Sequence, residues 1–452
     1  MKTKYPLFFI LIFLSTNTFA QTIIKQDSSI KNMVEEVSAK NIENTIRKLV
    51  SFKSRHTLGD TSSKTEGVGA ARNWIKAEME KYAELSGGRM KVQFDNFIQP
   101  KGERIDKPYL LKNVIATLKG TDRNDTRIYI VSGHFDSRKS NVMDPDGFEP
   151  GANDDASGTA VSMELARVMA KKSFPATLIF MCVVGEEQGL YGSANVAKRA
   201  KAEGWNIDAM LNNDIVGNTH GMETDLKDNR SVRVFSEGVA SVADEDKKMV
   251  ASLIAIGGEN DSPSRELARY VKEIGERYVD QLDVKLIYRR DRYLRGGDHT
   301  SFQLQGFTAV RFTEMNEDFT RQHQDVRTEK GIDYGDLPDF VDFNYAQKVA
   351  RMNLSILANL ASAPAQPINV GIITGELTNK TTLKWDEPKT GKKPIGYYVL
   401  MRETISPYWE KKFYVTETTT TLAYSKDNYL FAVQSVDADG HESLPVFPKP
   451  IK

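Results

Sequence analysis

The chain of 452 residues is poor in cysteine, with Cys182 as its single example. One cysteine forms no internal disulfide, so the stability of the fold must come from the burial of apolar side chains. Cys182 lies in the apolar run LIFMCVVG, which predicts a buried strand residue. A catalytic thiol is not expected there, because a thiol nucleophile needs an activating and partly exposed position.

The chain also lacks an excess of charge of either sign, with 61 Lys and Arg residues against 61 Asp and Glu residues. Binding to nucleic acid or to an anionic membrane surface is typical of a basic surplus. We therefore expect neither partner. After the N-terminal segment, no run reaches the roughly 18 apolar residues that a membrane helix needs. We therefore expect no membrane span in the mature protein.

The first twenty residues have the pattern of a secretory signal peptide. Lys2 and Lys4 are followed by an apolar stretch from Pro6 to Leu14, which is too short to span a bilayer. Small residues near Ala20 then form a cleavage site. This pattern predicts an exported protein, periplasmic or secreted; an uncleaved anchor helix is the alternative.

Most of the chain alternates between helical and strand patterns. Helical spacing of apolar residues covers 30–50, 66–84, 158–171, 264–283 and 343–361. Short apolar runs with β-branched residues are NVIATL, RIYIVSG, ATLIFMCVV, AMLNND and TAVRF. This alternation predicts an α/β fold with a central, mostly parallel sheet.

A change of pattern falls at residues 362–367, SAPAQP. Beyond it, TTLKW, YYVLMRE, FYVTE and NYLFAVQSV alternate with period two between turn residues. About 85 residues of short alternating strands is the size of one β-sandwich. The expected organisation is a signal peptide at 1–20, an α/β domain at 21–362 and an all-β domain at 363–452.

Five segments each contain a residue type that binds metal ions. They are SGHFDS (132–137), GANDDASG (151–158), VVGEEQGLYGS (183–193), LNNDIVGN (211–218) and RQHQDVRT (321–328). The candidate ligands are His134, Asp154, Glu187, Asp214 and His323. Two imidazoles and three carboxylates suit a pair of zinc ions with positions left open for water. Three of these segments follow predicted strands, and ligands of α/β sheets gather beyond the carboxyl ends of the strands.

The pair His134 and Asp136 adds a positioning argument. Residues i and i+2 leave a strand on the same side. Asp136 can therefore accept the second ring N–H of His134 and orient the imidazole for metal binding, which places it in the catalytic machinery. Taken alone, the pair is more typical of a polar strand end with a satisfied histidine.

Two pairs of adjacent acids strengthen the metal interpretation. Adjacent buried carboxylates repel each other unless cations neutralise them. We expect Asp154 to bridge two metal ions and Asp155 to support it structurally. Of Glu186 and Glu187, one can bind metal while the other takes the proton of a water molecule. Taken alone, the first pair is explained more simply by an Asx turn that caps a helix. The second pair, taken alone, is explained more simply as an exposed acid pair.

In this order, the five segments resemble the secreted dinuclear zinc aminopeptidases of the co-catalytic metallopeptidase clan, such as bacterial leucyl aminopeptidases. The resemblance implies a three-layer zinc-peptidase fold, two zinc ions and peptide substrates. It implies that His134 binds one zinc ion, that Asp154 bridges both and that Asp214 completes one zinc site. It also implies that Glu186 is the general base and Glu187 a ligand.

The resemblance covers roughly residues 40–362 and departs from the family's common pattern at the last ligand. Many relatives have a His followed several residues later by Asp-Thr, whereas here Asp325 follows His323 at a shorter spacing. We retain His323 as the fifth ligand. His299, in GGDHTSF, is similar to a family segment near the substrate pocket, and both a ligand role and a structural role stay open for it.

The C-terminal pattern resembles a fibronectin type III domain. Trp385 lies in the strand where such domains bury a tryptophan, and Tyr429 lies where their tyrosine corner falls. Another small β-sandwich is the alternative. In either case we expect an accessory module that binds protein or polysaccharide surfaces.

Three other functions stay open. A carboxypeptidase or dipeptidase would use an arginine cluster to bind a carboxylate, and the cluster before GGDH consists of Arg289, Arg290, Arg292 and Arg295. A solvated loop is the simpler explanation of that cluster. A single-zinc glutaminyl cyclase would not need five ligands. A non-catalytic adhesion protein would not need an intact Glu186.

Overall fold

The computed structural model describes residues 24–239, 247–293 and 295–452. The predicted signal peptide, residues 1–20, lies outside the described residues. In the described part of the chain, no helix is both long and apolar enough to cross a membrane.

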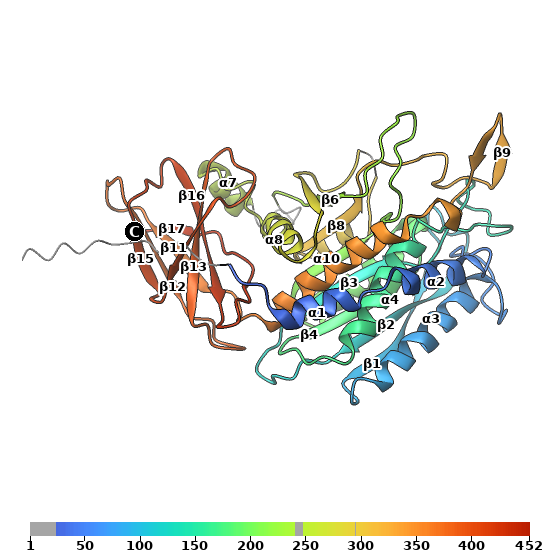
Figure 1. The fold of residues 1–452 in the computed structure, drawn as a ribbon, viewed down its shortest axis with the longest axis horizontal. Helices are drawn as coiled ribbons and strands as arrows, with labels where there is room; N and C mark the ends of the chain where they lie inside the picture. Colours follow the sequence, from blue (N-terminus) through green and yellow to red (C-terminus); the bar gives the residue numbers. More distant parts are fainter. Residues whose placement is uncertain (1–23, 240–246, 294) are drawn as a thin grey trace, which may run out of the picture.

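An eight-stranded mixed sheet forms the centre of the larger part of the molecule (Figure 1). Its strands are β1 (Met90–Gln99), β2 (Tyr109–Leu118), β3 (Ile128–His134), β4 (Thr177–Val183), β5 (Ile207–Asn213), β6 (Ser231–Phe235), β7 (Asp283–Ile287) and β8 (Ala309–Glu314). Their spatial order is β1-β2-β4-β3-β5-β8-β6-β7. The four neighbours β4, β3, β5 and β8 are parallel, whereas β2 and β6 pair with them antiparallel. The predicted α/β class is confirmed, with the parallel part at the middle of the sheet.

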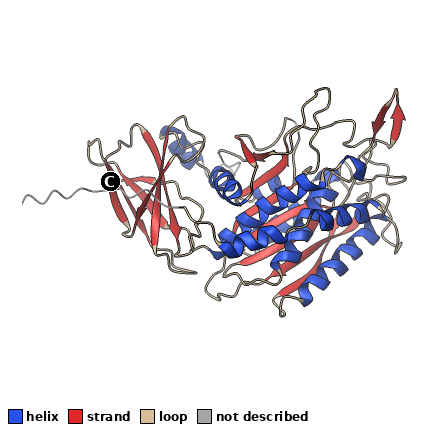
Figure 2. Ribbon diagram, viewed as in Figure 1, coloured by secondary structure: helices blue, strands red, loops and turns tan. Residues whose placement is uncertain are grey.

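Helices pack on both faces of this sheet, and one further helix, Lys247–Ala255, lies beside the C-terminal part (Figure 2). They are α1 (Ser28–Glu36), α2 (Ala39–Val50), α3 (Gly67–Glu84), α4 (Ala156–Met169), α5 (Glu186–Gly189), α6 (Tyr191–Ala202), α7 (Lys247–Ala255), α8 (Pro263–Tyr278), α9 (His299–Gln303), the 3-10 helix η2 (Pro338–Phe340) and α10 (Phe343–Ser362). A small hairpin of β9 (Arg327–Glu329) and β10 (Ile332–Tyr334) precedes η2. The helical spacing over 30–50 is divided into two helices, because Val37 is extended and Ser38 caps the start of α2.

The sheet is buried on both faces, which gives three layers. In β3, Tyr129 and Val131 pack into the core with α1, α2, α3, α4, α8 and α10. Ile130 between them points to the opposite face, where α6 and α9 pack. Burial on both faces explains the nearly continuous apolar runs of the parallel strands.

The C-terminal part consists of two small sheets. Their strands are β11 (Ile368–Ile373), β12 (Thr381–Asp386), β13 (Gly396–Glu403), β14 (Lys411–Val415), β15 (Thr419–Leu422), β16 (Tyr429–Val436) and β17 (Lys449–Ile451). The sheet β15-β12-β11-β17 and the sheet β14-β13-β16 share one apolar core. In that core the rings of Trp385 and Tyr397 pack edge to face, with 5.3 Å between their centroids. Tyr429 begins β16, and the fibronectin type III assignment stays a prediction.

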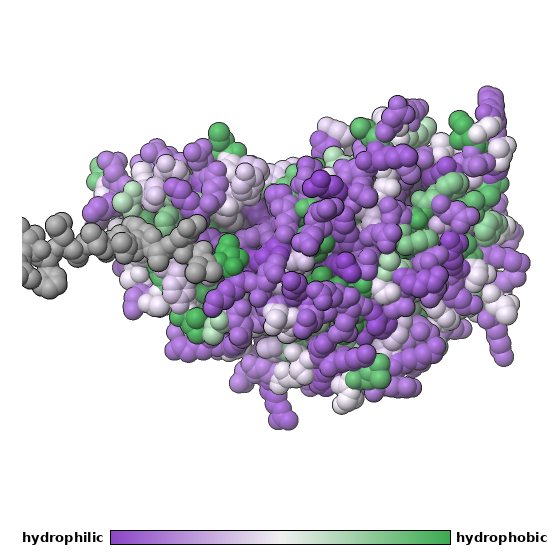
Figure 3. All heavy atoms as spheres, viewed as in Figure 1, coloured by the Kyte–Doolittle hydropathy of each residue, from purple (hydrophilic) through white to green (hydrophobic). Residues whose placement is uncertain are grey.

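Buried charged side chains connect this C-terminal part to α8. Arg402 of β13 lies 2.8 Å from Asp261, which also accepts a hydrogen bond from Arg269 of α8. The indole of Trp409 donates to Glu266 at 2.8 Å. Helix α7 also lies beside the C-terminal sheets (Figures 1 and 2), and the two border a cavity of about 680 Å³. The surface in Figure 3 is mostly hydrophilic, with small apolar areas.

Candidate metal centre

The carboxyl ends of three adjacent parallel strands present the candidate ligands. His134 is the last residue of β3, and Asp214 directly follows β5. Glu187 lies in the short helix α5, which begins three residues after β4 ends. Because β4, β3 and β5 are parallel neighbours, these side chains reach the same edge of the sheet.

The loop before α4 is held in place by carboxylates that bind its backbone. Asp336 accepts hydrogen bonds from the N–H groups of Asn153 and Asp154, at 2.7–2.9 Å. Asp155 caps α4 through the N–H of Gly158 at 2.9 Å and also accepts the N–H of His134 at 3.0 Å. A β-carbon on Gly158 would lie 2.2 Å from a backbone oxygen of β5, so the helix start approaches the strand closely only with glycine there.

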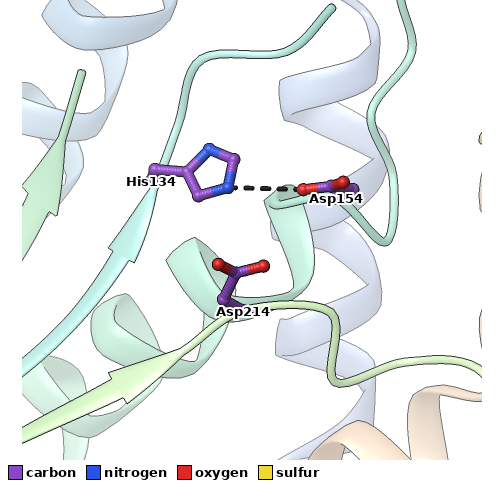
Figure 4. A group of neighbouring side chains, drawn as sticks. All are labelled: His134, Asp154 and Asp214. Atoms are coloured by element: carbon purple, nitrogen blue, oxygen red, sulfur yellow. Dashed lines mark ion pairs between the residues drawn. The ribbon is translucent and has the colours of Figure 1, made fainter. Parts of the chain in front are cut away.

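The first candidate ligand cluster joins β3, the loop before α4 and the residue after β5. One ligand atom from each of His134, Asp154 and Asp214 lies within 4.8 Å of the others. His134 Nε2 is 3.3 Å from Asp154 Oδ1, and Figure 4 shows the three side chains pointing toward one another. All three side chains are buried.

The second cluster shares Asp154 with the first. His323 Nε2 lies 2.9 Å from Asp154 Oδ2 and 3.1 Å from Glu187 Oε2. The three ligand atoms again lie within 4.8 Å of one another. Asp154 thus offers one oxygen to each cluster, which is the arrangement that a carboxylate bridging two metal ions needs.

The donor atoms of these clusters fit divalent cations. Within the described ranges, Glu187 Oε1 is buried without a hydrogen-bond partner, and the buried Nε2 atoms of His134 and His323 face carboxylate oxygens of the site. Such atoms are costly unless something else binds them. Two imidazoles with three carboxylates is a donor set that zinc accepts.

The electrostatics of the site also favour bound cations. Burial raises the pKa of Asp155 well above its usual value, and the charges of Asp214 and Asp154 raise it further. Burial likewise raises the pKa of Glu186, helped by Asp214 and Glu187. Buried carboxylates this close destabilise one another's charged forms, and a divalent cation among them relieves that repulsion.

Asp136 contacts His134 more closely through its backbone oxygen than through the predicted carboxylate. His134 Nδ1 lies 3.1 Å from the backbone oxygen of Asp136 and 3.6 Å from its carboxylate. The carboxylate instead accepts the hydroxyl of Thr57 at 2.8 Å and the N–H of Glu187 at 3.2 Å. The reason is that β3 ends at His134, so the i, i+2 geometry of a strand does not extend to Asp136.

Arg138 was not singled out from the sequence, although it directly follows the segment of His134. Its Nε donates to Glu187 at 2.9 Å, and its Nη2 lies 2.6 Å from Nδ1 of His323. Metal binding through Nε2 of His323 requires a proton on Nδ1. Two donors then face each other, so metal binding would release Arg138 from this histidine.

His299 lies outside both ligand clusters. It is fully buried, and its Nε2 is 2.9 Å from the backbone oxygen of Arg290. Burial lowers its pKa to about 4, although Asp291 opposes the shift. The structure therefore gives His299 a packing position behind the site.

Only part of the predicted arginine cluster faces the candidate site. Arg292 and Arg295 line a cleft of about 320 Å³ above the two ligand clusters. Arg289 stacks instead on the ring of exposed Tyr293, 3.7 Å from its centroid. Arg290 pairs with Glu237 at 2.8 Å.

Comparisons with known proteins identify the family of the chain. The family model "Peptidase family M28" matches residues 113–345, which contain all five candidate ligands. A probable zinc metalloprotease of Leptosphaeria maculans is 47% identical over 425 residues, which are 94% of this chain and 97% of that protein.

Solved structures share the fold at low identity. The LapA aminopeptidase of Legionella pneumophila aligns with a TM-score of 0.52 and 20% identity over 75% of this chain and 76% of that chain. The glutaminyl cyclase of Macrostomum lignano aligns with a TM-score of 0.50 and 17% identity, over 75% of this chain and 95% of that chain. The fold thus carries more than one reaction. On the family model and the close relative together, the chain belongs to peptidase family M28.

Proposed function

We propose that the protein is an exported zinc aminopeptidase that uses two zinc ions and Glu186 as its general base. The observation that supports this most strongly is the pair of ligand clusters that share Asp154. Zinc is supported by the donor set and by the name of the Leptosphaeria relative. Export is supported by the signal-peptide pattern of residues 1–20.

Five of the candidate residues would act as metal ligands, and one would act as the general base. His134 and Asp214 would bind one zinc ion, and Glu187 and His323 would bind the other. Asp154 would bind both ions. Zinc, when bound, polarises the scissile carbonyl and lowers the pKa of a water molecule.

Glu186 is the group that moves the proton. Its Oε2 lies 4.0 Å from Nε2 of His134, and the residue lines the cleft. It would take a proton from the attacking water and give it to the leaving amine. Glu186 belongs to neither cluster of candidate ligands. Its carboxylate is therefore available for proton transfer.

Metal analysis and peptide cleavage together test the proposal. Purified protein loaded with zinc should contain two zinc ions per chain and remove N-terminal residues from unblocked peptides. N-acetylated peptides should resist. Cleavage of N-acetylated peptides from the carboxyl end would instead identify a carboxypeptidase. Cyclisation of N-terminal glutamine with one zinc ion per chain would identify a glutaminyl cyclase.

A further inference from the structure

The cleft above the ligand clusters is lined almost entirely by charged side chains. Its described lining side chains are Arg104, Arg138, Asp154, Glu186, Glu187, Leu190, Asp214, Arg292, Arg295 and His323. Leu190 is the one apolar side chain in this described lining. An apolar substrate side chain would therefore gain little by entering the cleft, because it would bury little apolar surface there.

The arginines and carboxylates of this lining have equal and opposite formal charges. Four arginines face four carboxylates. Two divalent cations would therefore give the cleft an excess of positive charge. A low-dielectric cleft of that kind attracts anionic groups.

Arg292 and Arg295 lie on the loop between β7 and α9 and share one counter-ion. Both place Nη1 at 2.9 Å from Oε2 of Glu317. Arg233 occupies the other oxygen of this carboxylate at 2.7 Å. Burial alone would raise the pKa of Glu317, but the three guanidinium groups lower it to about 2. Arg292 also pairs with Asp291 at 3.2 Å. Arg295 shares Glu317 with two other guanidinium groups, so positive charge remains at this wall of the cleft.

Arg104 comes from a different loop, between β1 and β2, and is exposed. Its Nη1 donates to the backbone oxygen of Glu187 at 3.2 Å. Among the described residues it has no carboxylate partner within ion-pair distance. This contact places the guanidinium next to a candidate metal ligand while its other donors stay available.

We infer that Arg104, Arg292 and Arg295 bind a carboxylate of the substrate close to the scissile bond. Guanidinium groups bind carboxylates through paired, charge-assisted hydrogen bonds. The carboxylate can be the α-carboxylate of a C-terminal residue or the side chain of Asp or Glu, since both offer the same chemistry. The inference rests on the proposed function and specifies its substrate class.

Matched peptide pairs test this preference. The pair Ala-Ala and Ala-Ala-amide isolates the α-carboxylate. The pairs Ala-Glu-amide with Ala-Gln-amide and Glu-Ala-amide with Gln-Ala-amide isolate an acidic side chain on either side of the bond. We expect kcat/KM of the carboxylate member to exceed that of its amide by about tenfold or more in at least one pair, the range of a hydrogen-bonded charge pair.

Variants of the arginines assign that preference to them. Arg104→Gln, Arg295→Gln and the double variant should reduce the ratio between the two members of the pair toward one. They should change the rate of the amide member much less. Arg230→Gln removes the same charge at an exposed position outside the cleft and should leave the ratio unchanged. Equal losses for both members would indicate that these arginines only support the loops.

Calorimetric binding gives a readout that does not need turnover. Glutarate should bind the zinc-loaded protein about tenfold more tightly than butyrate, because its second carboxylate reaches the arginines. The double variant should lose this difference but keep the binding of butyrate to zinc. Equal rates within all three pairs and equal binding of the two acids would overturn the inference and leave the peptidase proposal standing. Absence of all peptide hydrolysis would contradict the peptidase proposal, and the calorimetry would then decide the inference alone.

Discussion

Arg311 and Asp214 form a buried ion pair directly behind the first ligand cluster, with 2.8 Å between Nη2 and Oδ1. Arg311 is fully buried and is held from its other side by Asp291 at 3.1 Å. Burial raises the pKa of Asp214 above its usual value, and the Arg311 guanidinium opposes this shift while it orients the carboxylate toward His134. A candidate metal ligand owes its position to a residue on the neighbouring strand β8.

This pair predicts a defect in metal affinity. Arg311→Lys keeps the charge but loses the planar group that contacts Asp214 and Asp291 together. Replacing the partners of metal ligands typically costs about 10–100-fold in metal affinity. We expect a loss of that size for one of the two zinc ions, measured by competition with a chelator. Unchanged affinity for both ions in a folded variant would show that Arg311 only stabilises the core.

Glu186→Gln should separate proton transfer from metal binding. Gln keeps the shape of the side chain but accepts no proton. General base catalysis is worth about 10²–10⁴-fold in rate. We expect kcat to fall by at least that factor with metal content unchanged. Glu35→Gln, on the exposed face of α1, is the matched control. Turnover close to normal would remove Glu186 from the mechanism.

His441 should make stability depend on pH. It lies between two carboxylates, with Nδ1 2.8 Å from Asp437 and Nε2 2.7 Å from Asp27. Burial lowers the pKa of His441, but hydrogen bonds and charge from these acids raise it above its usual 6.5. Lys392, 2.7 Å from Asp437, partly offsets this.

The direction of the pH dependence follows from the raised pKa of His441. A raised pKa in the folded state stabilises the protein fully below pH 6.5, and the contribution is lost as the pH rises through the higher folded pKa. His441→Asn should therefore lower the free energy of unfolding more at pH 6 than at pH 9. His220→Asn, at an exposed site, should show no such difference. Parallel pH profiles of His441→Asn and the natural protein would contradict the prediction.

A chain that ends at Ser362 should keep zinc and hydrolyse small peptides, because every candidate ligand precedes that point. Its melting temperature should fall, since Asp261 and Glu266 lose their partners Arg402 and Trp409. Residues 365–452 should fold alone around Trp385. A shortened protein that is folded and zinc-loaded but inactive would show that the C-terminal part shapes the active site.

The positions of the strands and of the candidate ligands along the chain could be predicted from sequence, because both depend on local patterns. Apolar runs mark β3, β4 and β5, and His134, Glu187 and Asp214 stand where those runs end. Parallel strands bring such ends to one edge of a sheet whatever else the fold does. These three candidate residues could therefore be grouped from local patterns, whereas Asp154 and His323 were assigned through the family resemblance.

Partners from distant segments could not be predicted in this way. Asp336 holds the loop of Asp154, and Arg138 contacts Glu187 and His323, but no local period connects these residues. The Asp136 carboxylate, predicted to accept a hydrogen bond from His134, lies 3.6 Å from its Nδ1 and accepts the hydroxyl of Thr57, because the strand ends at His134.

The sequence by itself determined the layered α/β architecture and the identity of the candidate ligands, because apolar periodicity and residue chemistry are local properties. Only the tertiary structure decided which arginines face the cleft. Arg289, Arg290, Arg292 and Arg295 look alike along the chain. They separate in space because Tyr293, Glu237 and Glu317 compete for them by charge and stacking, and these partners are placed by the packing of the whole fold.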